Sequence, residues 1–172
     1  MIRTINLKGT PVLYTSAIQC MEPASTDLTT AVADSIWNME VMDLITDLKD
    51  TAENIANNCL GLAANQIWSK EPPCPAVFVM RWPDPKEVRQ WSWKAIINPV
   101  IKGTGPTLKL EEGCLSFPDK PVRKSRSKNV ILTYQSEFDS TRTAVKFLQH
   151  QGWFSHIIQH EMDHLLGKTI RK

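Results

Sequence analysis

The segment that most constrains this chain is His160-Glu161-Met162-Asp163-His164, which lies close to its end. The chain is predicted to close with a helix from about Trp153 to Leu166, and Gly167 suits the C-cap of that helix. Residues four apart share one face of a helix, so both histidines can bind the same metal ion. Glu161 is near enough to reach a water on that ion. The alternative interpretation is two surface histidines on a terminal helix.

Two histidines do not complete a catalytic metal site, which usually has three protein ligands and a water. Only eight residues follow His164, and none of them is a His, Cys, Asp or Glu. The third ligand is therefore expected upstream, and the candidates are Cys114, His150, His156 and the carboxylates. A thiolate is a good ligand for a divalent transition metal. A pocket-lining or hydrogen-bonded role is favoured for His156, and His150 is expected at the surface.

A third segment, Gly61-Leu62-Ala63-Ala64-Asn65-Gln66, follows a predicted long helix. Small residues let a backbone approach a site closely, and the amide of Gln66 can donate a hydrogen bond to a developing oxyanion. Taken alone, such a segment more often marks helix packing or a helix end. The remaining cysteines, Cys20, Cys59 and Cys74, are expected to be small buried hydrophobic residues.

The distribution of apolar residues predicts an α+β fold with mostly antiparallel sheets around the helix that carries the two histidines. An amphipathic helix is expected from about residue 35 to residue 57, with a start that can lie nearer Thr26. Residues 11–25 are expected to form a loop. Strands are expected at 76–82, 94–101, 107–116, 129–136 and 141–148.

The segment between two of these strands, residues 119–128, holds five basic residues and one acidic residue. The interpretation that we favour is a solvated loop. The alternative is that some of these side chains bind the carboxyl end of a peptide or nearby ribosomal RNA. The five basic residues are Lys120, Arg123, Lys124, Arg126 and Lys128.

Length and composition exclude several classes of protein. A chain of 172 residues, 42% of them hydrophobic, is expected to form one domain over residues 1–172. Twenty Lys and Arg against 18 Asp and Glu leave a net charge of +2, too weak to indicate nucleic-acid binding. The sequence shows neither the apolar core of a signal peptide nor an apolar run of about 20 residues. We therefore expect a cytoplasmic protein with reduced cysteines and no membrane contact.

Together, the three segments resemble those of the peptide deformylases. That family carries G-x-G-hydrophobic-A-A-x-Q, then E-G-C-L-S, then H-E-x-D-H, in this order. The present chain has CLGLAANQ at 59–66, EGCLS at 112–116 and HEMDH at 160–164. The second and third segments match fully. The first departs at its opening glycine, which is Cys59 here, although none of the chemical groups implied for catalysis is lost.

The resemblance implies that Cys114, His160 and His164 hold one divalent metal ion, with water as the fourth ligand. The family metal is usually Fe(II), and Zn, Ni or Co often replaces it. The implied substrate is the N-formylmethionyl end of a new polypeptide, and the products are formate and a free amino terminus. The resemblance thus implies a metal-dependent hydrolase that acts in protein biosynthesis.

The resemblance also implies roles for residues around the metal. Glu161 is implied to be the general base and then the general acid, and Gln66 and the backbone N–H of Leu115 are implied to stabilise the oxyanion. Asp163 either holds a basic residue or a ligand in place, or is a solvated carboxylate on the helix face. Substrate-binding residues are expected at Gly61, Glu112, Gly113, Trp153, His156 and Ile157.

Two other functions are alternatives to a deformylase, and the sequence disfavours both. A zinc endopeptidase with the same histidine motif is disfavoured by the upstream Cys114 and by the lack of a downstream ligand. A non-catalytic metal-binding homologue is disfavoured by the intact Glu161, which metal binding does not require. The short C-terminal end resembles compact deformylases encoded by some bacteriophages. This resemblance implies weakened contact with the ribosome. The protein is expected to be a monomer, in the cytoplasm of a bacterium or of a host cell if a phage encodes it.

Overall fold

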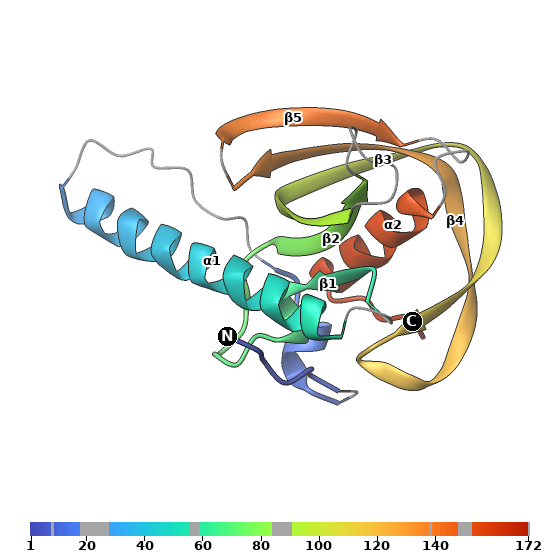
Figure 1. Ribbon diagram of the computed structural model, residues 1–172, viewed down its shortest axis with the longest axis horizontal. Coiled ribbons are helices and arrows are strands. Elements are labelled where there is room, and N and C mark those ends of the chain that lie inside the picture. Colours follow the sequence, from blue (N-terminus) through green and yellow to red (C-terminus); the bar gives the residue numbers. More distant parts are fainter. Residues whose placement is uncertain are drawn as a thin grey trace.

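A five-stranded antiparallel sheet, with strand order β1-β2-β3-β4-β5, forms the centre of the molecule (Figure 1). This computed structural model describes residues 1–7, 9–17, 28–55, 59–83, 91–137, 139–147 and 153–171. Each strand pairs with the next one along the chain, as in a meander. The strands are β1 (Gly61–Ala63), β2 (Val77–Pro83), β3 (Trp91–Cys114), β4 (Phe117–Ser136) and β5 (Asp139–Phe147).

The two α-helices pack against opposite faces of the sheet, because the side chains of β2 alternate between two apolar cores. Val77 and Val79 belong to the core that contains α1 (Leu28–Asn54). Phe78 and Met80 belong to the core that contains α2 (Phe154–Leu165). Figure 1 shows α2 enclosed by the curled pair β3 and β4, with α1 across β1 and β2. The expectation of an α+β fold, with one helix before the strands and one after them in the chain, is confirmed.

The helix α1 buries one face against β1 and β2. Its buried residues recur at three- and four-residue intervals, as an amphipathic helix requires: Val41, Leu44, Ile45, Leu48 and Ala52. The helix begins at Leu28, so the start near residue 35 was wrong and the alternative nearer Thr26 is the better one. Among the residues that the structure describes, no helix is long and apolar enough to cross a membrane.

The helix α2 ends as the sequence predicted. Gly167 follows it with a φ of +67°, in the left-handed region that glycine tolerates best. A side chain at this position would also collide with the backbone of Tyr14, because a Cβ would lie 2.8 Å from the Tyr14 carbonyl oxygen. Gly167 therefore both ends the helix and lets the N-terminal segment pass close to it.

The strand predictions need correction at the centre of the sheet. The strands expected at 94–101 and 107–116 are one strand, β3, whose pairing with β4 shifts register between Thr104 and Thr107. That irregularity accommodates Gly105, with a φ of +75°, and Pro106, which has no N–H to donate. The basic segment 119–128 is not a loop but part of β4. The polar sequence of this segment gives no strand pattern, and the strand forms because it pairs with β3.

Two shorter segments also differ from their predictions. Residues 61–63 form β1, followed by the 3-10 turn η3 (Ala64–Gln66), rather than a helix end. Within the expected loop at 11–25, Pro11–Tyr14 form the 3-10 turn η1. Cys59 and Cys74 are buried, as predicted. Cys20 and His150 lie outside the described residues.

The buried face of α1 gives a test of the fold. Leu48 is fully buried, so Leu48→Ala is expected to lower the free energy of unfolding by about 2–5 kcal/mol through lost transfer energy and the cavity left behind. Urea denaturation followed by circular dichroism measures this loss. Met39→Ala, on the exposed side of the same helix, is the control and is expected to change stability by less than about 0.5 kcal/mol. Equal losses in the two variants would contradict this packing of α1.

Candidate active site

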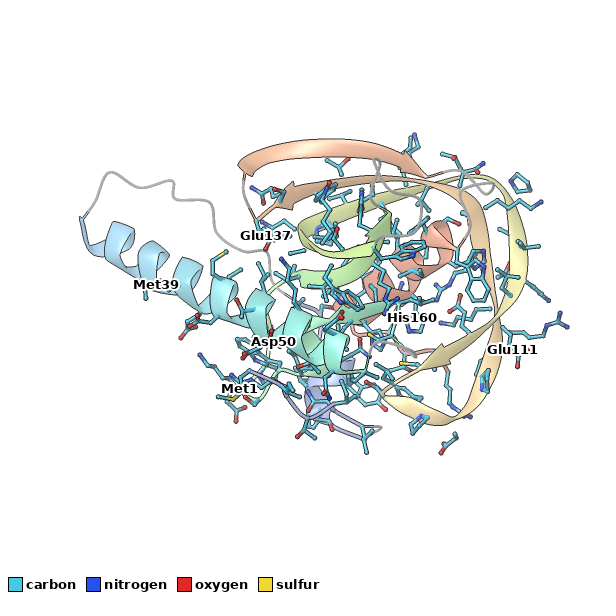
Figure 2. All side chains as sticks on the ribbon, in the orientation of Figure 1. Met1, Met39, Asp50, Glu111, Glu137 and His160 are labelled. Atoms are coloured by element: carbon cyan, nitrogen blue, oxygen red, sulfur yellow. The ribbon has the colours of Figure 1, made fainter. Side chains whose placement is uncertain are left out.

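The turn between β3 and β4 brings a cysteine to the two histidines of α2. Cys114 ends β3, and its Sγ lies 3.2 Å from His164 Nε2. The ligand atoms of Cys114, His160 and His164 all lie within 4.8 Å of one another. Figure 2 shows His160 on α2 near the middle of the view and Glu111, from the same strand as Cys114, at the edge of the molecule. Of the upstream candidates for a third ligand, the structure brings Cys114 to the histidines.

This group fits a divalent transition metal. One thiolate and two imidazoles around a tetrahedral ion lie about 3.5 Å from one another, given metal–ligand distances of about 2.0–2.3 Å. The distance of 3.2 Å between Cys114 Sγ and His164 Nε2 is close to that value, and all three ligand atoms lie within 4.8 Å of one another. Burial lowers the pKa of His164 to about 3, so its ring is neutral, which is the form that binds a metal.

Glu112 orients the ring of His160. Its Oε2 lies 3.1 Å from His160 Nδ1, and its two oxygens accept hydrogen bonds of 2.8 and 2.9 Å from Arg126. Burial acts to raise the pKa of Glu112, but the hydrogen bonds from Arg126 and His160 outweigh it and lower this pKa to about 2. The carboxylate is therefore ionised and fixes Nδ1 of His160, which leaves the other ring nitrogen for a metal.

The basic segment supplies two cations to the interior. Arg126 is buried and donates a 2.6 Å hydrogen bond to Asp163. Lys124 donates to the same Asp163 oxygen at 3.2 Å and to the carbonyl of Thr169 at 3.1 Å. Of the two alternatives for Asp163, the one in which it holds a basic residue is confirmed. The interpretation of these two cations as solvated loop residues was wrong, because alternate residues of a strand point to one face and that face covers α2.

Glu161 is buried beside the backbone of β1. A Cβ at Gly61 would lie 2.6 Å from Glu161 Oε1, so any side chain at position 61 would force this carboxyl group to shift. Glu161 Oε2 is buried and has no hydrogen-bond partner within the described part of the chain. Burial raises the pKa of Glu161 to about 7, although the nearby His160 acts to lower it. The group can therefore gain and lose a proton near neutral pH.

The turn η3 holds Gln66 and the backbone of α2 in place. Gln66 Oε1 accepts a 2.9 Å hydrogen bond from the N–H of Ala63, and its Nε2 lies 3.3 Å from Ser116 Oγ and 4.0 Å from Cys114 Sγ. The neighbouring Asn65 donates a 2.6 Å hydrogen bond to the carbonyl of His164. Sequence reasoning singled out Gln66 but missed Asn65, whose only signal was its place in the same segment.

A cavity of about 620 Å³ opens at this group of residues. All six residues expected to bind substrate line it: Gly61, Glu112, Gly113, Trp153, His156 and Ile157. The apolar residues Leu60, Leu110 and Pro118 also line it, and sequence reasoning missed them. Leu60 precedes β1, Leu110 lies in β3 and Pro118 lies in β4, so no local pattern joins them. The cavity therefore combines an apolar wall with the Cys114, His160 and Glu161 side chains.

Comparison with known proteins decides the family. The family model described as polypeptide deformylase matches residues 4–172. The chain belongs to this family. It is 35% identical over 135 residues to the peptide deformylase of Aquifex aeolicus, which covers 78% of this chain and 73% of that one. It is 33% identical over 167 residues to peptide deformylase 2 of Streptomyces avermitilis, covering 96% of this chain and 76% of that one.

A solved structure agrees with the sequence comparisons. The crystal structure of the peptide deformylase of Thermotoga maritima superposes with a TM-score of 0.73 at 27% identity, covering 99% of this chain and 96% of that one. Deformylases remove the N-formyl group from nascent peptides, and this chain is such an enzyme. The deformylase interpretation of the sequence is confirmed, and the endopeptidase alternative is dropped.

The close contact between Gly61 and Glu161 can be tested by adding one methyl group at position 61. Gly61→Ala is expected to displace the Glu161 carboxyl group and to lower kcat for deformylation by at least about 100-fold, the scale of a lost acid–base group. Formate release and metal content are measured on the same preparation, and the metal content is expected to stay unchanged. Met39→Ala, on the exposed side of α1 and outside the cavity, is the comparison and is expected to keep its kcat. An equal loss in both variants would contradict the role of this contact.

Proposed function

We propose that Cys114, His160 and His164 bind one divalent metal ion and that Glu161 transfers protons in the deformylation reaction. The observation that carries the proposal is the clustering of three ligand atoms within 4.8 Å at the wall of a cavity that also contains Glu161. The metal is Fe(II) in the cell, and Zn, Ni or Co can replace it, because thiolate and imidazole ligands suit all four. The metal-binding helix is α2, within one catalytic domain that spans residues 1–172.

Glu161 serves first as general base and then as general acid. When bound, the metal ion lowers the pKa of a water molecule and polarises the formyl carbonyl. Glu161 accepts the proton of the attacking water and later delivers it to the departing amine, so that formate and a free amino terminus result. A pKa of about 7 suits both steps, because the group is neither a strong acid nor a strong base at neutral pH.

The amide of Gln66 and the backbone N–H of Leu115 stabilise the oxyanion that forms at the formyl carbon. Support comes from the fixed orientation of Gln66, whose Oε1 is held by Ala63 so that its Nε2 faces Cys114. Leu115 directly follows Cys114 and lines the same cavity. Loss of one such donor typically raises a reaction barrier by about 3 kcal/mol.

The cavity receives the first residue of the formylated peptide, with the apolar wall taking its side chain. Gly61, Glu112 and Gly113 border the position of the peptide, while Trp153, His156 and Ile157 line the side-chain pocket. The protein acts on nascent chains in the cytoplasm as a monomer.

The activity itself is tested by formate release. The purified protein, loaded anaerobically with Fe(II) or with Ni, is expected to release formate from formyl-Met-Ala-Ser. Glu161→Gln keeps the size of the side chain but removes its proton transfer, and is expected to lower kcat about 10²–10⁴-fold. Formate is quantified enzymatically, and the metal content of both proteins is measured alongside. If the wild-type protein releases no more formate than Glu161→Gln, the proposed function is wrong.

The ligand set is tested by metal content. Cys114→Ala removes one of three proposed ligands, so the variant is expected to retain well under one metal ion per chain after dialysis against a weak chelator. Mass spectrometry of the metal, with wild-type protein treated in parallel, measures this. Cys74→Ala, which removes a buried cysteine outside the group, is the matched control and is expected to keep its metal. Tight binding by Cys114→Ala would refute the assignment.

A further inference from the structure

One buried side chain beside the active site has no part in the steps above. Asn65 lies in η3 and is 0% exposed. Its Nδ2 donates a 2.6 Å hydrogen bond to the carbonyl oxygen of His164, 99 residues further along the chain. Its Oδ1 makes no hydrogen bond to any residue that the structure describes. Because burying an amide costs free energy unless hydrogen bonds compensate, the bond to His164 is the contact that keeps this side chain in place.

This bond fixes the backbone of a proposed metal ligand at the C-terminal end of α2. The carbonyl groups in the last turn of a helix have no N–H further along the helix to bind. The carbonyl oxygen of His164 instead accepts the N–H of Gly167 at 2.9 Å and the Asn65 amide. A carbonyl oxygen has two lone pairs, so these two donors saturate it. The position of His164 therefore depends on η3 as well as on its own helix.

The N-terminal segment holds η3 through Asn6. The Nδ2 of Asn6 donates 2.9 Å hydrogen bonds to the carbonyl oxygens of Asn65 and Trp68. The backbone N–H of Asn6 donates a 2.6 Å hydrogen bond to the carbonyl oxygen of Gln66. Three carbonyl groups in or just after η3 are thus bound to a single residue. The turn cannot shift without breaking hydrogen bonds to Asn6.

Asn65 and Gln66 are neighbours in η3 that reach two different ligand residues. The Asn65 amide is bound to His164, whereas Gln66 Nε2 lies 4.0 Å from Cys114 Sγ. Neither Asn65 nor Asn6 is among the described residues that line the cavity. A shift of η3 would therefore move the Gln66 amide relative to His164, while the cavity walls from β3 and β4 stay in place. A displacement of about 1 Å in an active site can lower a rate by about 100-fold.

We propose that Asn65, held in place by Asn6, is a positioning residue for deformylation: it fixes the metal ligand His164 relative to the Gln66 amide. Asn65 acts through these two residues and not by contact with the substrate. The inference rests on the proposed function, because it takes His164 as a metal ligand and Gln66 as an oxyanion donor. A protein without the Asn65 amide is expected to bind peptide normally, to lose its metal faster and to react more slowly.

The test removes the amide of Asn65 and compares the result with a loss of stability alone. In nickel-loaded protein, Asn65→Ala is expected to lower kcat for formate release by about 10–100-fold and to leave KM within about twofold. In cobalt-loaded protein, transfer of Co(II) to excess chelator is expected to be at least about tenfold faster, with a changed visible spectrum of the bound ion. Leu48→Ala, which removes buried packing outside the cavity, is expected to keep both kcat and the cobalt spectrum.

A second pair of variants tests the role of Asn6. Asn6→Ala removes the two side-chain hydrogen bonds to η3 and is expected to change kcat and the rate of cobalt loss in the same directions, by about three- to tenfold. Arg3→Ala is the matched control, because Arg3 joins the same segment to Asp47 of α1 and not to η3. It is expected to stay within about twofold of wild type. If circular dichroism shows that Asn65→Ala does not fold, this pair decides, and equal values for Asn6→Ala and Arg3→Ala overturn the inference.

The cobalt measurements separate this inference from the proposed function. If wild-type protein releases formate but Asn65→Ala keeps the wild-type kcat or the wild-type rate of cobalt loss, the inference is refuted and the function stands. An equal fall of kcat in Leu48→Ala and Asn65→Ala would show a general loss of stability and would also refute it. If wild-type protein releases no formate, the proposed function fails, and the rate of cobalt loss decides on Asn65 by itself. Equal rates in wild type and Asn65→Ala, or no cobalt binding by wild type, would then overturn the inference.

Discussion

The carboxylate of Glu112, whose side chain is 9% exposed, joins the three elements that build the site. It lies on β3, accepts two hydrogen bonds from Arg126 of β4, and contacts His160 of α2. Because these partners lower its pKa to about 2, the group stays charged through the physiological range. Removing one partner would leave a buried charge uncompensated, which costs several kcal/mol. The orientation of His160 and the seating of the hairpin on α2 therefore depend on the same ion pair.

The length of the β3–β4 hairpin decides which residues can meet at α2. Cys114 and His164 are 50 residues apart in sequence, and the turn after β3 brings them within 3.2 Å. The same hairpin brings Arg126 back to α2, where it donates a hydrogen bond to Asp163. A strand pair that curls around a helix can thus bring a thiol of the candidate metal site and an orienting cation from one continuous segment.

Close approach of β1 to α2 is the second constraint on the site. Gly61 leaves the volume that the Glu161 carboxyl group occupies, and η3 anchors the carbonyl of His164 through Asn65. Burial in this narrow space raises the pKa of Glu161 to about 7. Packing and acid–base chemistry are therefore linked, since the close contact with Gly61 is part of the burial that raises the pKa of Glu161.

Sequence reasoning recovered the parts of the fold with a clear local period. The amphipathic helix α1 and the helix α2 were found, as was the strand at 76–82, because their apolar residues repeat with helical or strand spacing. The polar half of β4 was missed and β3 was divided at Gly105. Their hydrogen bonds come from a partner strand, and a partner strand leaves no trace in the local pattern. For the same reason, the sequence favours a solvated loop at Arg126 and Lys124, although both residues lie on β4.

The sequence by itself determined two histidines on one helix face with a carboxyl group between them, and it left Cys114 as one of several candidates for a third ligand. Helix periodicity alone places His160 beside His164, so that pair needed no tertiary information. Only the tertiary structure decided that Cys114, rather than His156, joins them, and that Asp163 holds Arg126. The physical reason is that these contacts, and the burial that shifts the pKa of Glu161, depend on strand register and packing between segments far apart in the chain.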